Sequence, residues 1–385
     1  MTTQSFKPLN SKDVVTTREL LHESIPITGS LLSGTYGNTA TSTEFPNEPN
    51  IKNFSHGMFQ SIYDYPYLSS SANHIFDITV GYSTSSTWAH SDEPIPNGDN
   101  TQNTAKLNIY NQMAQVLVGH DHTGSIKTFQ IPGGDLIREA YFVNFSRLLV
   151  KDEIKKGSFS IEFGTGSTFV TAHDYAGSTR KLVDYGATTY YTDSPAGDYA
   201  VLTMSANPPE WEQGGKPAGL IYYQAGIAVL SASMFWPLDA SHIEKNADHD
   251  ADDYIAISGS GVGLTKDDDN LTFKNLLVSS SISGTANALR RRIDNLEFQN
   301  TTELNSTVHF CRLNHGEFNY SSNPTYLSES KIQVKGNDKS ALPISYVTTI
   351  GLYGPDNALL AVAKLSRPLK KTSTNEITLR VRLDY

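Results

Sequence analysis

The chain has 385 residues and a formal net charge of −10, with 38% apolar and 18% charged residues. An acidic chain lacks the basic face that collects phosphate groups, so the composition excludes a general nucleic-acid binder. The low charged fraction and the heavy use of Ser, Thr, Asn, Gly and Tyr favour short strands and hydrogen-bonding loops over long charged helices. The single cysteine, Cys311, excludes an internal disulfide framework, and its apolar neighbours indicate a buried, inert thiol.

The length is compatible with two or three domains, or with one large β-rich domain that carries insertions. The first residues form no apolar signal segment, and no run approaches about 18 apolar residues. We therefore expect a protein that is made in a cytoplasm and is neither exported by a signal peptide nor inserted into a membrane. No repeat of about 20–50 residues is visible, which argues against a solenoid or a propeller.

Residues 1–58 are expected to form an extended N-terminal arm. Within this arm, residues 12–22 predict one helix with Ser11 as its cap. Residues 29–53 are rich in Ser, Thr, Asn, Gly and Pro, and such a stretch cannot bury its own backbone in a core. We expect contacts with other chains to order this arm.

Residues 59–240 predict a central α+β region. Residues 76–82 alternate as a strand, whereas the apolar residues of 105–117 recur at helical spacing and predict a helix. A second helix is predicted over residues 138–155, because an apolar stripe is followed by the stop signal Lys155-Lys156-Gly157. Residues 158–236 predict several strands separated by turns that carry Gly and Pro.

Residues 241–272 are expected to form an acidic loop insertion. Residues 244–269 hold eight acidic residues and two lysines, whereas residues 364–382 hold six basic residues and one acid. Separated patches of opposite charge suit packing between subunits, because complementary potentials set the register of an interface. Two solvated loops would give the same composition.

Residues 273–385 predict a C-terminal antiparallel β-domain that is interrupted by a short helix near residues 286–292. Its last part predicts three strands, over residues 345–353, 358–366 and 377–385, and Pro355 and Asp356 occupy the centre of a type I turn. The third strand alternates apolar and polar residues, as a half-buried strand does; its apolar positions are Ile377, Leu379, Val381, Leu383 and Tyr385. We expect the three strands to form a β-meander. The fold class predicted for the whole chain is therefore α+β, dominated by β-structure.

Two clusters could hold a metal ion. His120 and His122 flank Asp121, and on an extended loop the two imidazoles would point the same way and could bind a transition metal. The run Asp248-His249-Asp250-Ala251-Asp252 could bind a hard cation, but it lacks the Gly and Glu of an EF-hand loop. Solvated loops are the alternative for both clusters, so no metal ligand is assigned.

The remaining motifs do not assign a chemistry. Gly164-Thr165-Gly166 lacks the Gly-Lys-Ser/Thr half of a phosphate-binding loop, and neither a nucleophile elbow nor a zinc-protease motif is present. Arg290-Arg291-Arg292 stands next to a short helix, where an interface or salt-bridge role is favoured over nucleic-acid binding. We therefore predict no catalytic residue, no cofactor-binding residue and no cofactor.

Several segments resemble virion proteins of contractile-tailed bacteriophages. Residues 346–353 (Tyr-Val-Thr-Thr-Ile-Gly-Leu-Tyr), 359–365 (Leu-Leu-Ala-Val-Ala-Lys-Leu) and 377–383 (Ile-Thr-Leu-Arg-Val-Arg-Leu) are similar to a module of tail-fibre and baseplate proteins. Residues 145–159, 300–312 and 318–326 resemble blocks of virion proteins in T-even-like and marine myophages. The resemblance extends over roughly residues 55–385.

The resemblance implies a non-enzymatic structural subunit of a virion, in the tail baseplate or at the attachment of tail fibres. Its partners would be other virion proteins and copies of itself, assembled in the host cytoplasm, with no nucleic acid and no membrane insertion. A neck, collar or capsid-surface protein is an alternative location. A phage protein that binds or cleaves glycans is a second alternative, because carboxylates distant in sequence can meet in a folded site.

Overall fold

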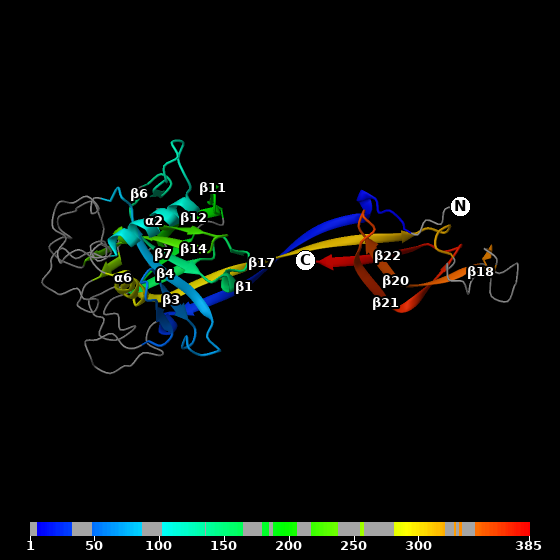
Figure 1. Ribbon diagram of the computed structural model, residues 1–385, viewed down its shortest axis with the longest axis horizontal. Helices are drawn as coiled ribbons and strands as arrows, with labels where there is room; N and C mark the ends of the chain where they lie inside the picture. Colours follow the sequence, from blue (N-terminus) through cyan, green and yellow to red (C-terminus); the bar gives the residue numbers. More distant parts are fainter. Residues whose placement is uncertain are drawn as a thin grey trace. The chain divides into compact units, whose positions relative to one another are not determined.

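The computed structural model describes residues 6–32, 48–86, 102–134, 136–164, 179–184, 188–205, 217–237, 255–257, 281–319, 327–328, 331–332 and 343–385. The chain divides into two compact units: unit 1 comprises Met1–Leu20 and Glu303–Tyr385, and unit 2 comprises Leu21–Thr302 (Figure 1). Two long strands, β1 (Val14–Thr28) and β17 (Ile293–Leu313), contribute residues to both units. The domain boundaries expected at residues 58, 240 and 272 therefore differ from this division.

Unit 2 is built mainly from one antiparallel sheet. Its strands, besides parts of β1 and β17, are β2 (Ile51–Asn53), β3 (Gln60–Tyr63), β4 (His74–Tyr82), β7 (Glu139–Phe145), β8 (Glu153–Ile154), β9 (Ser160–Gly164), β10 (Thr179–Asp184), β11 (Tyr191–Ser194), β12 (Gly197–Ser205), β13 (Pro217–Tyr222) and β14 (Ile227–Ser231). Neighbouring strands follow the order β17-β9-β10-β12-β13-β14-β7-β4-β3-β2, with β8 also paired to β17 and β11 to β12. The predicted β-dominated α+β class is confirmed.

Short elements complete unit 2. The helices are α1 (Gly29–Leu32), α2 (Asn103–Leu117), α3 (Arg147–Val150) and α6 (Ile282–Arg290), with a 3-10 turn at Ala232–Met234; the small strand pairs are β5 (Phe129–Gln130) with β6 (Leu136–Ile137), and β15 (Phe235–Pro237) with β16 (Ile255–Ile257). Helix α2 confirms the helix predicted over residues 105–117, and α6 confirms the short helix near residues 286–292. In the described part of the chain, no helix is long and apolar enough to cross a membrane.

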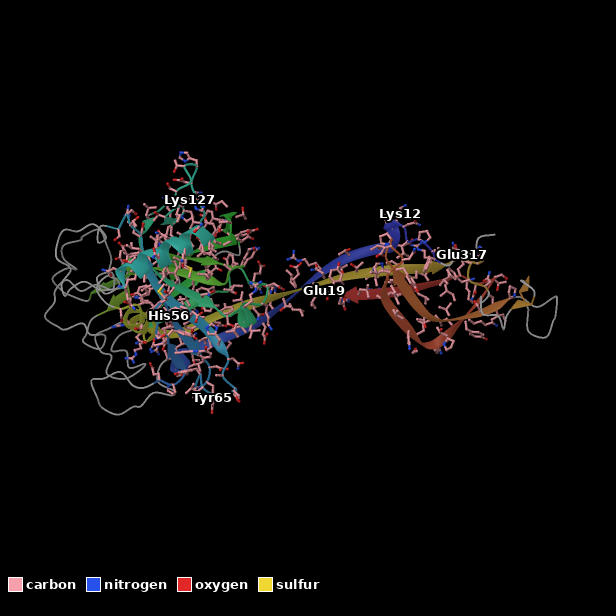
Figure 2. All side chains as sticks on the ribbon, viewed as in Figure 1. Lys12, Glu19, His56, Tyr65, Lys127 and Glu317 are labelled. Carbon is pink, nitrogen blue, oxygen red and sulfur yellow. The ribbon has the colours of Figure 1, made fainter. Side chains whose placement is uncertain are left out.

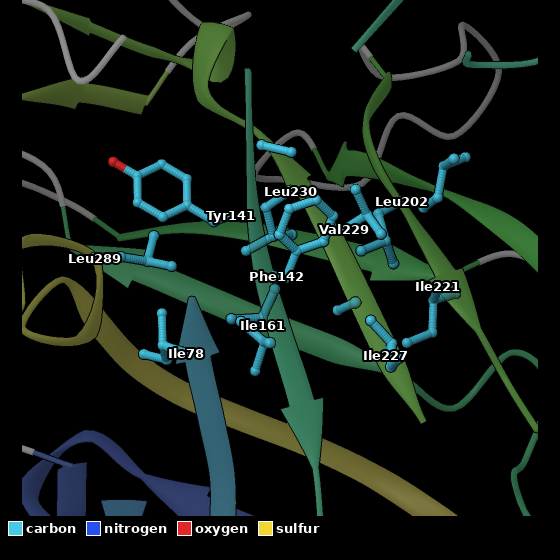
Figure 3. Close-up of a cluster of buried hydrophobic side chains, with 14 of the residues drawn as sticks. Ile78, Tyr141, Phe142, Ile161, Leu202, Ile221, Ile227, Val229, Leu230 and Leu289 are labelled. Carbon is cyan, nitrogen blue, oxygen red and sulfur yellow. The ribbon is translucent and has the colours of Figure 1, made fainter. Parts of the chain in front are cut away.

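The core of unit 2 gathers around the central strands β7 and β14. Tyr141 lies opposite Leu230, and Phe142 lies opposite Val229, in the antiparallel register of these strands. All four side chains are buried (Figure 3). Burial on both faces of the sheet explains why β7 reads as a nearly continuous apolar run.

Two predicted helices are wrong, for different reasons. Residues 138–155 form β7, the single turn α3 and the short strand β8, because a buried central strand and a buried helix give similar apolar runs. Residues 12–22 lie mostly in β1, where β-branched Val14, Val15, Thr16 and Thr17 suit an extended backbone that pairs with β17. The predicted N-terminal arm thus contains a 15-residue strand, and its residues 33–47 lie outside the described part.

Helix α2 packs closely on β4 because Gly81 has no side chain. A Cβ added at Gly81 would stand 2.7 Å from the carbonyl oxygen of Lys106 and 2.9 Å from the backbone nitrogen of Tyr110. Both atoms belong to the helix backbone, so they cannot move without shifting α2. The backbone of α2 can therefore come this close to β4 because position 81 is a glycine.

Replacing Gly81 should destabilise unit 2. We expect Gly81→Ala to lower the free energy of unfolding by about 1–3 kcal/mol, because the new methyl group pushes α2 off the sheet. Gly316→Ala is the matched control, since a Cβ there meets no atom within 4 Å. Urea unfolding of both variants checks this, and equal stability of the two would contradict the close contact.

Lys106 lies on the covered side of α2 and is fully buried. Burial lowers the pKa of its ammonium group from 10.5 to about 8. At pH values between the pKa of the folded chain and that of the unfolded chain, the unfolded chain binds more protons. The free energy of unfolding therefore rises with pH in this range.

This rise should amount to about 2 kcal/mol between pH 8 and 9.5. We expect Lys106→Met to reduce the rise by this amount relative to the parent, which thermal or urea unfolding of both proteins across this pH range would show. Burial also lowers the pKa of Lys371, but this contribution is the same in both proteins. Burial raises the pKa of Tyr110 and Tyr141, so these groups cost stability only above pH 10 and stay outside the window. The same pH slope in the variant would assign the rise to another group.

Candidate assembly surface

The described side chains of unit 1 form almost no apolar core of their own. Its elements, besides parts of β1 and β17, are a 3-10 turn (Ser11–Asp13), β18 (Leu327–Ser328), β19 (Lys331–Ile332), β20 (Ile344–Tyr353), β21 (Leu359–Thr372) and β22 (Ile377–Asp384). Among the side chains whose burial is described in this unit, which leaves out those of β18 and β19, Val308 (5% exposed) and Val381 (7%) are the only buried apolar ones. Every other buried apolar side chain of the described chain belongs to unit 2.

The last strand of the chain pairs with β17. Antiparallel register joins Thr307 to Leu383, His309 to Val381 and Cys311 to Leu379. These residues share one face of the strand pair, because opposite residues in a ladder point to the same side. The predicted alternation of the last strand is confirmed, and its apolar face includes the buried Val381.

The predicted meander is wrong. Strands β20 and β21 form a hairpin that is hydrogen-bonded to no other described strand, and β22 pairs with β17 instead. The hairpin turn itself matches the prediction: Asn357 N–H donates to the carbonyl of Gly354 at 3.0 Å, with Pro355 and Asp356 between them. Asn357 takes a left-handed conformation (φ 61°), the usual way for a type I turn to rejoin its strands. The turn could be predicted because its residues are adjacent in the sequence, whereas the pairing of distant strands could not.

Unit 1 contains a groove of about 1760 Å³. Its walls are the N-terminal segment 6–13, the end of β17 (residues 309–314) and the whole of β20, with Leu379 and Leu383 of β22 between them. The ring of Phe6 meets that of Tyr353 edge-on, with centroids 4.7 Å apart and an interplanar angle of 63°. The groove is therefore walled largely by apolar side chains from distant parts of the chain.

Two cations beside the groove, Lys7 and Arg312, are paired within unit 1. Lys7 forms an ion pair with Glu317, and Arg312 Nε lies 2.8 Å from Asp13 Oδ1. The hydrogen bond from Lys7 lowers the pKa of the Glu317 carboxyl below its ordinary value. Lys12, Glu19 and Glu317 mark the surface of this unit in Figure 2. These pairs anchor the N-terminal segment and neutralise charge at the groove wall.

The buried lysine of the hairpin has a structural role. Lys371 Nζ donates to Asn319 Oδ1 at 2.7 Å and to the carbonyl of Thr372 at 2.7 Å, with His315 O at 3.4 Å. Burial lowers the pKa of this ammonium group. The contacts fasten β21 to the segment that follows β17, so the hairpin is attached at its base.

Many apolar side chains of unit 1 remain exposed. They come from the N-terminal segment, β1, the segment after β17, the hairpin and the end of the chain; they are Phe6, Leu9, Val15, Leu20, Phe318, Ile344, Tyr346, Tyr353, Leu359, Leu360, Val362 and Tyr385. Single exposed apolar residues are ordinary, but a concentration of them in a unit with so few buried apolar side chains among those described marks an interaction surface.

The histidine pair lies on a hairpin of unit 2. His120 and His122 are both exposed, and His120 pairs with Ile126 across the hairpin. The Asp121 carboxylate accepts hydrogen bonds from Thr123 and Ser125, and the Thr123 hydroxyl lowers its pKa. This acid therefore completes a turn. Across the described ranges, no three His, Cys, Asp or Glu side chains cluster as a metal site would require.

The three arginines are structural in unit 2. Arg290 forms a buried ion pair with Glu48, and its Nε donates to Gln60 Oε1 at 3.2 Å. Arg291 lies 3.5 Å from the same carboxylate, and its burial lowers its pKa to about 10. Arg292 donates to the carbonyl of Gly164 at 3.2 Å. The interface or salt-bridge role favoured for this run is confirmed, as a salt bridge, for Arg290 and Arg291.

Several other candidates lie at the edge of the described part or beyond it. Cys311 is half-buried in the groove wall, and burial raises the pKa of its thiol. Gly164 ends β9, but Thr165 and Gly166 fall outside the described residues. The run Asp248-His249-Asp250-Ala251-Asp252 and most of the acidic insertion also fall outside them.

Sequence reasoning missed the groove because its walls are about 300 residues apart along the chain. One signal was available: the hairpin strands carry apolar residues on both faces, at Tyr346 and Val347 and again at Ala361 and Val362. A strand with two apolar faces must be covered on both.

The chain matches no family model, no curated protein and no solved structure.

Removing residues 383–385 should destabilise unit 1 by about 2–4 kcal/mol, because the loss takes away part of an apolar face and several hydrogen bonds. Asn305 and Tyr385 exchange two backbone hydrogen bonds, and Ser306 Oγ donates to Asp384 Oδ1 at 2.5 Å. Tyr385→Ser is the control, because this 72% exposed side chain can change while the backbone pairing stays. Thermal unfolding compares the two, and a truncated chain that melts with the parent would show that β22 contributes nothing to stability.

Proposed function

We propose that the chain is a non-enzymatic structural subunit of a bacteriophage virion, placed in the baseplate or at the tail-fibre attachment of a contractile tail. The observation that carries the assembly role is the burial of the described side chains of unit 1, of which only two apolar ones are buried and many are exposed. A unit of this kind gains its stability from surfaces outside itself. The location in a virion rests on the resemblance of residues 346–353, 359–365 and 377–383 to the tail module.

The internal ordering of the chain also supports a structural role. Among the described residues of unit 2, several charged groups lie in ion pairs, as in the Glu48–Arg290 pair and the His74–Asp77 contact at 2.8 Å. Groups used in this way hold elements together. A rigid scaffold with an incomplete second unit suits a protein that joins a larger assembly.

Locating the chain in particles tests this proposal directly. We expect contractile-tailed particles purified from the natural source to contain the chain at a fixed number of copies, measured by quantitative mass spectrometry. Antibody labelling in electron micrographs should place it at the baseplate end of the tail. Labelling at the neck, collar or capsid would favour the alternative location, and absence from particles that are free of host proteins would contradict the proposal.

The basic surface of β21 should take part in incorporation. Lys364 and Lys370 are exposed on this strand, so Lys364→Glu with Lys370→Glu should spare thermal stability but reduce incorporation several-fold, more strongly at low salt. The matched control reverses Lys127 and Lys181, which are exposed lysines of unit 2. Equal incorporation of both double variants would mean that the β21 charges are only solvated.

A further inference from the structure

The amine of Lys371 lies against the carboxamide of Asn319 inside unit 1. Its Nζ donates to Asn319 Oδ1 at 2.7 Å, and the lysine is fully buried (0% exposed). The other partners of this amine are the backbone carbonyls of Thr372 at 2.7 Å and His315 at 3.4 Å. All three partners are neutral, whereas a buried lysine is ordinarily paired with an acid. Burial among neutral groups therefore disfavours the ammonium form relative to the neutral amine.

The carboxamide of Asn319 is also held in place. Its Nδ2 donates to the carbonyl of His315 at 2.6 Å, which limits the rotation of the group. Because the C=O bond is about 1.2 Å long, Asn319 Cγ lies about 3–4 Å from the lysine Nζ. Reacting atoms that are held about 3–3.5 Å apart are close enough for a bond to form. The contact therefore places an amine at attacking distance from a carboxamide carbon.

The surroundings of this contact favour a reaction. Burial lowers the pKa of Lys371, which increases the share of the neutral, nucleophilic amine. The nearby charges of Glu317 and, less strongly, Glu376 oppose this shift without cancelling it. Glu317 stands two residues before Asn319, and its Oε2 accepts hydrogen bonds from Lys7 and from a backbone N–H. This carboxylate can accept the proton that the Lys371 ammonium group must lose before the amine attacks.

We propose that Lys371 and Asn319 become joined by an internal amide (isopeptide) bond. The neutral Nζ attacks Asn319 Cγ, so that the Nζ–Cγ bond forms, the Cγ–Nδ2 bond breaks and Nδ2 leaves as ammonia. The ammonium group of Lys371 begins with three hydrogens and keeps one in the new amide. Glu317 carries the other two, one after the other, to Nδ2, which departs as an ammonium ion. Charge and atoms balance without any oxidant or further reactant.

The bond would fasten the end of β21 to the segment after β17, which is 52 positions away in the sequence. The single cysteine of the chain cannot form an internal disulfide, and an amide bond constrains the unfolded chain in the same way as a disulfide does. Small units with little apolar burial commonly depend on such links. Unit 1 is of this kind, since only two of its described apolar side chains are buried. The inference concerns unit 1 alone and does not depend on the proposed function.

Glu317 can be tested by the rate at which the bond forms after cell-free synthesis of the full chain, followed by peptide mapping. We expect Glu317→Gln to slow the bond at least about tenfold, because the proton carrier is lost. Lys7→Gln is the matched control, since it breaks the same ion pair but keeps the carboxylate, and it should react at the parental rate. A parental rate in Glu317→Gln would overturn the role assigned to this carboxylate.

Mass spectrometry of the purified full chain tests the bond itself. We expect the intact chain to be lighter by one ammonia than its sequence, and a tryptic digest to contain a branched peptide that joins Asn319 to Lys371. Lys371→Arg keeps the positive charge and the long side chain but removes the nucleophile, so this variant should have its full sequence mass. A parent chain without the branched peptide would overturn the proposal, and this result needs no variant to fold. A loss of ammonia that persists in Lys371→Arg would also overturn it, because another asparagine would then be the source.

Discussion

Both units depend on the backbone pairing of strand β17. In unit 2 it pairs with β9 and β8, and in unit 1 it pairs with β22 through eight register positions from Ser306 to Leu313. The sequence of β17 reflects these two settings. Residues 293–301 are mostly buried, as expected of a strand inside a covered sheet, whereas residues 302–313 are mostly half-exposed. One continuous strand thus takes part in a well-packed unit and in one whose described side chains are mostly exposed or half-buried.

The contrast between the units explains the composition of the chain. Unit 2 contains the large aromatic and aliphatic core around β7 and β14, and its stability follows from burial in the ordinary way. Unit 1 relies on backbone pairing, on ion pairs such as Arg312–Asp13, and on the hydrogen bonds of Lys371. Such contacts specify geometry but contribute little net stability when exposed. We propose that other chains complete unit 1.

Local features could be predicted from the sequence, and long-range pairings could not. Helix α2 and the Gly354–Asn357 turn follow from spacing and turn residues within a few positions of each other. The pairing of β22 with β17 depends on residues about 70 positions apart, which no local pattern specifies. Residues 138–155 show the other limit, because an apolar stripe cannot distinguish a buried strand from a helix. The groove could not be predicted because its walls come from distant parts of the chain. Only the apolar residues on both faces of the hairpin strands indicated that the hairpin has a covered side.

The central claim is that unit 1 is completed by other chains, and hydrogen exchange at two protein concentrations tests it most directly. In a dilute sample the amides of β20 and β21 should exchange rapidly, while those of β4 and β7 stay protected by the core of unit 2. At a concentration where the chain associates, β20 and β21 should become protected by at least about tenfold, and β4 and β7 should not change. Strong protection of β20 and β21 in a chain shown to be monomeric would contradict the account, because the hairpin would then be stable without a partner.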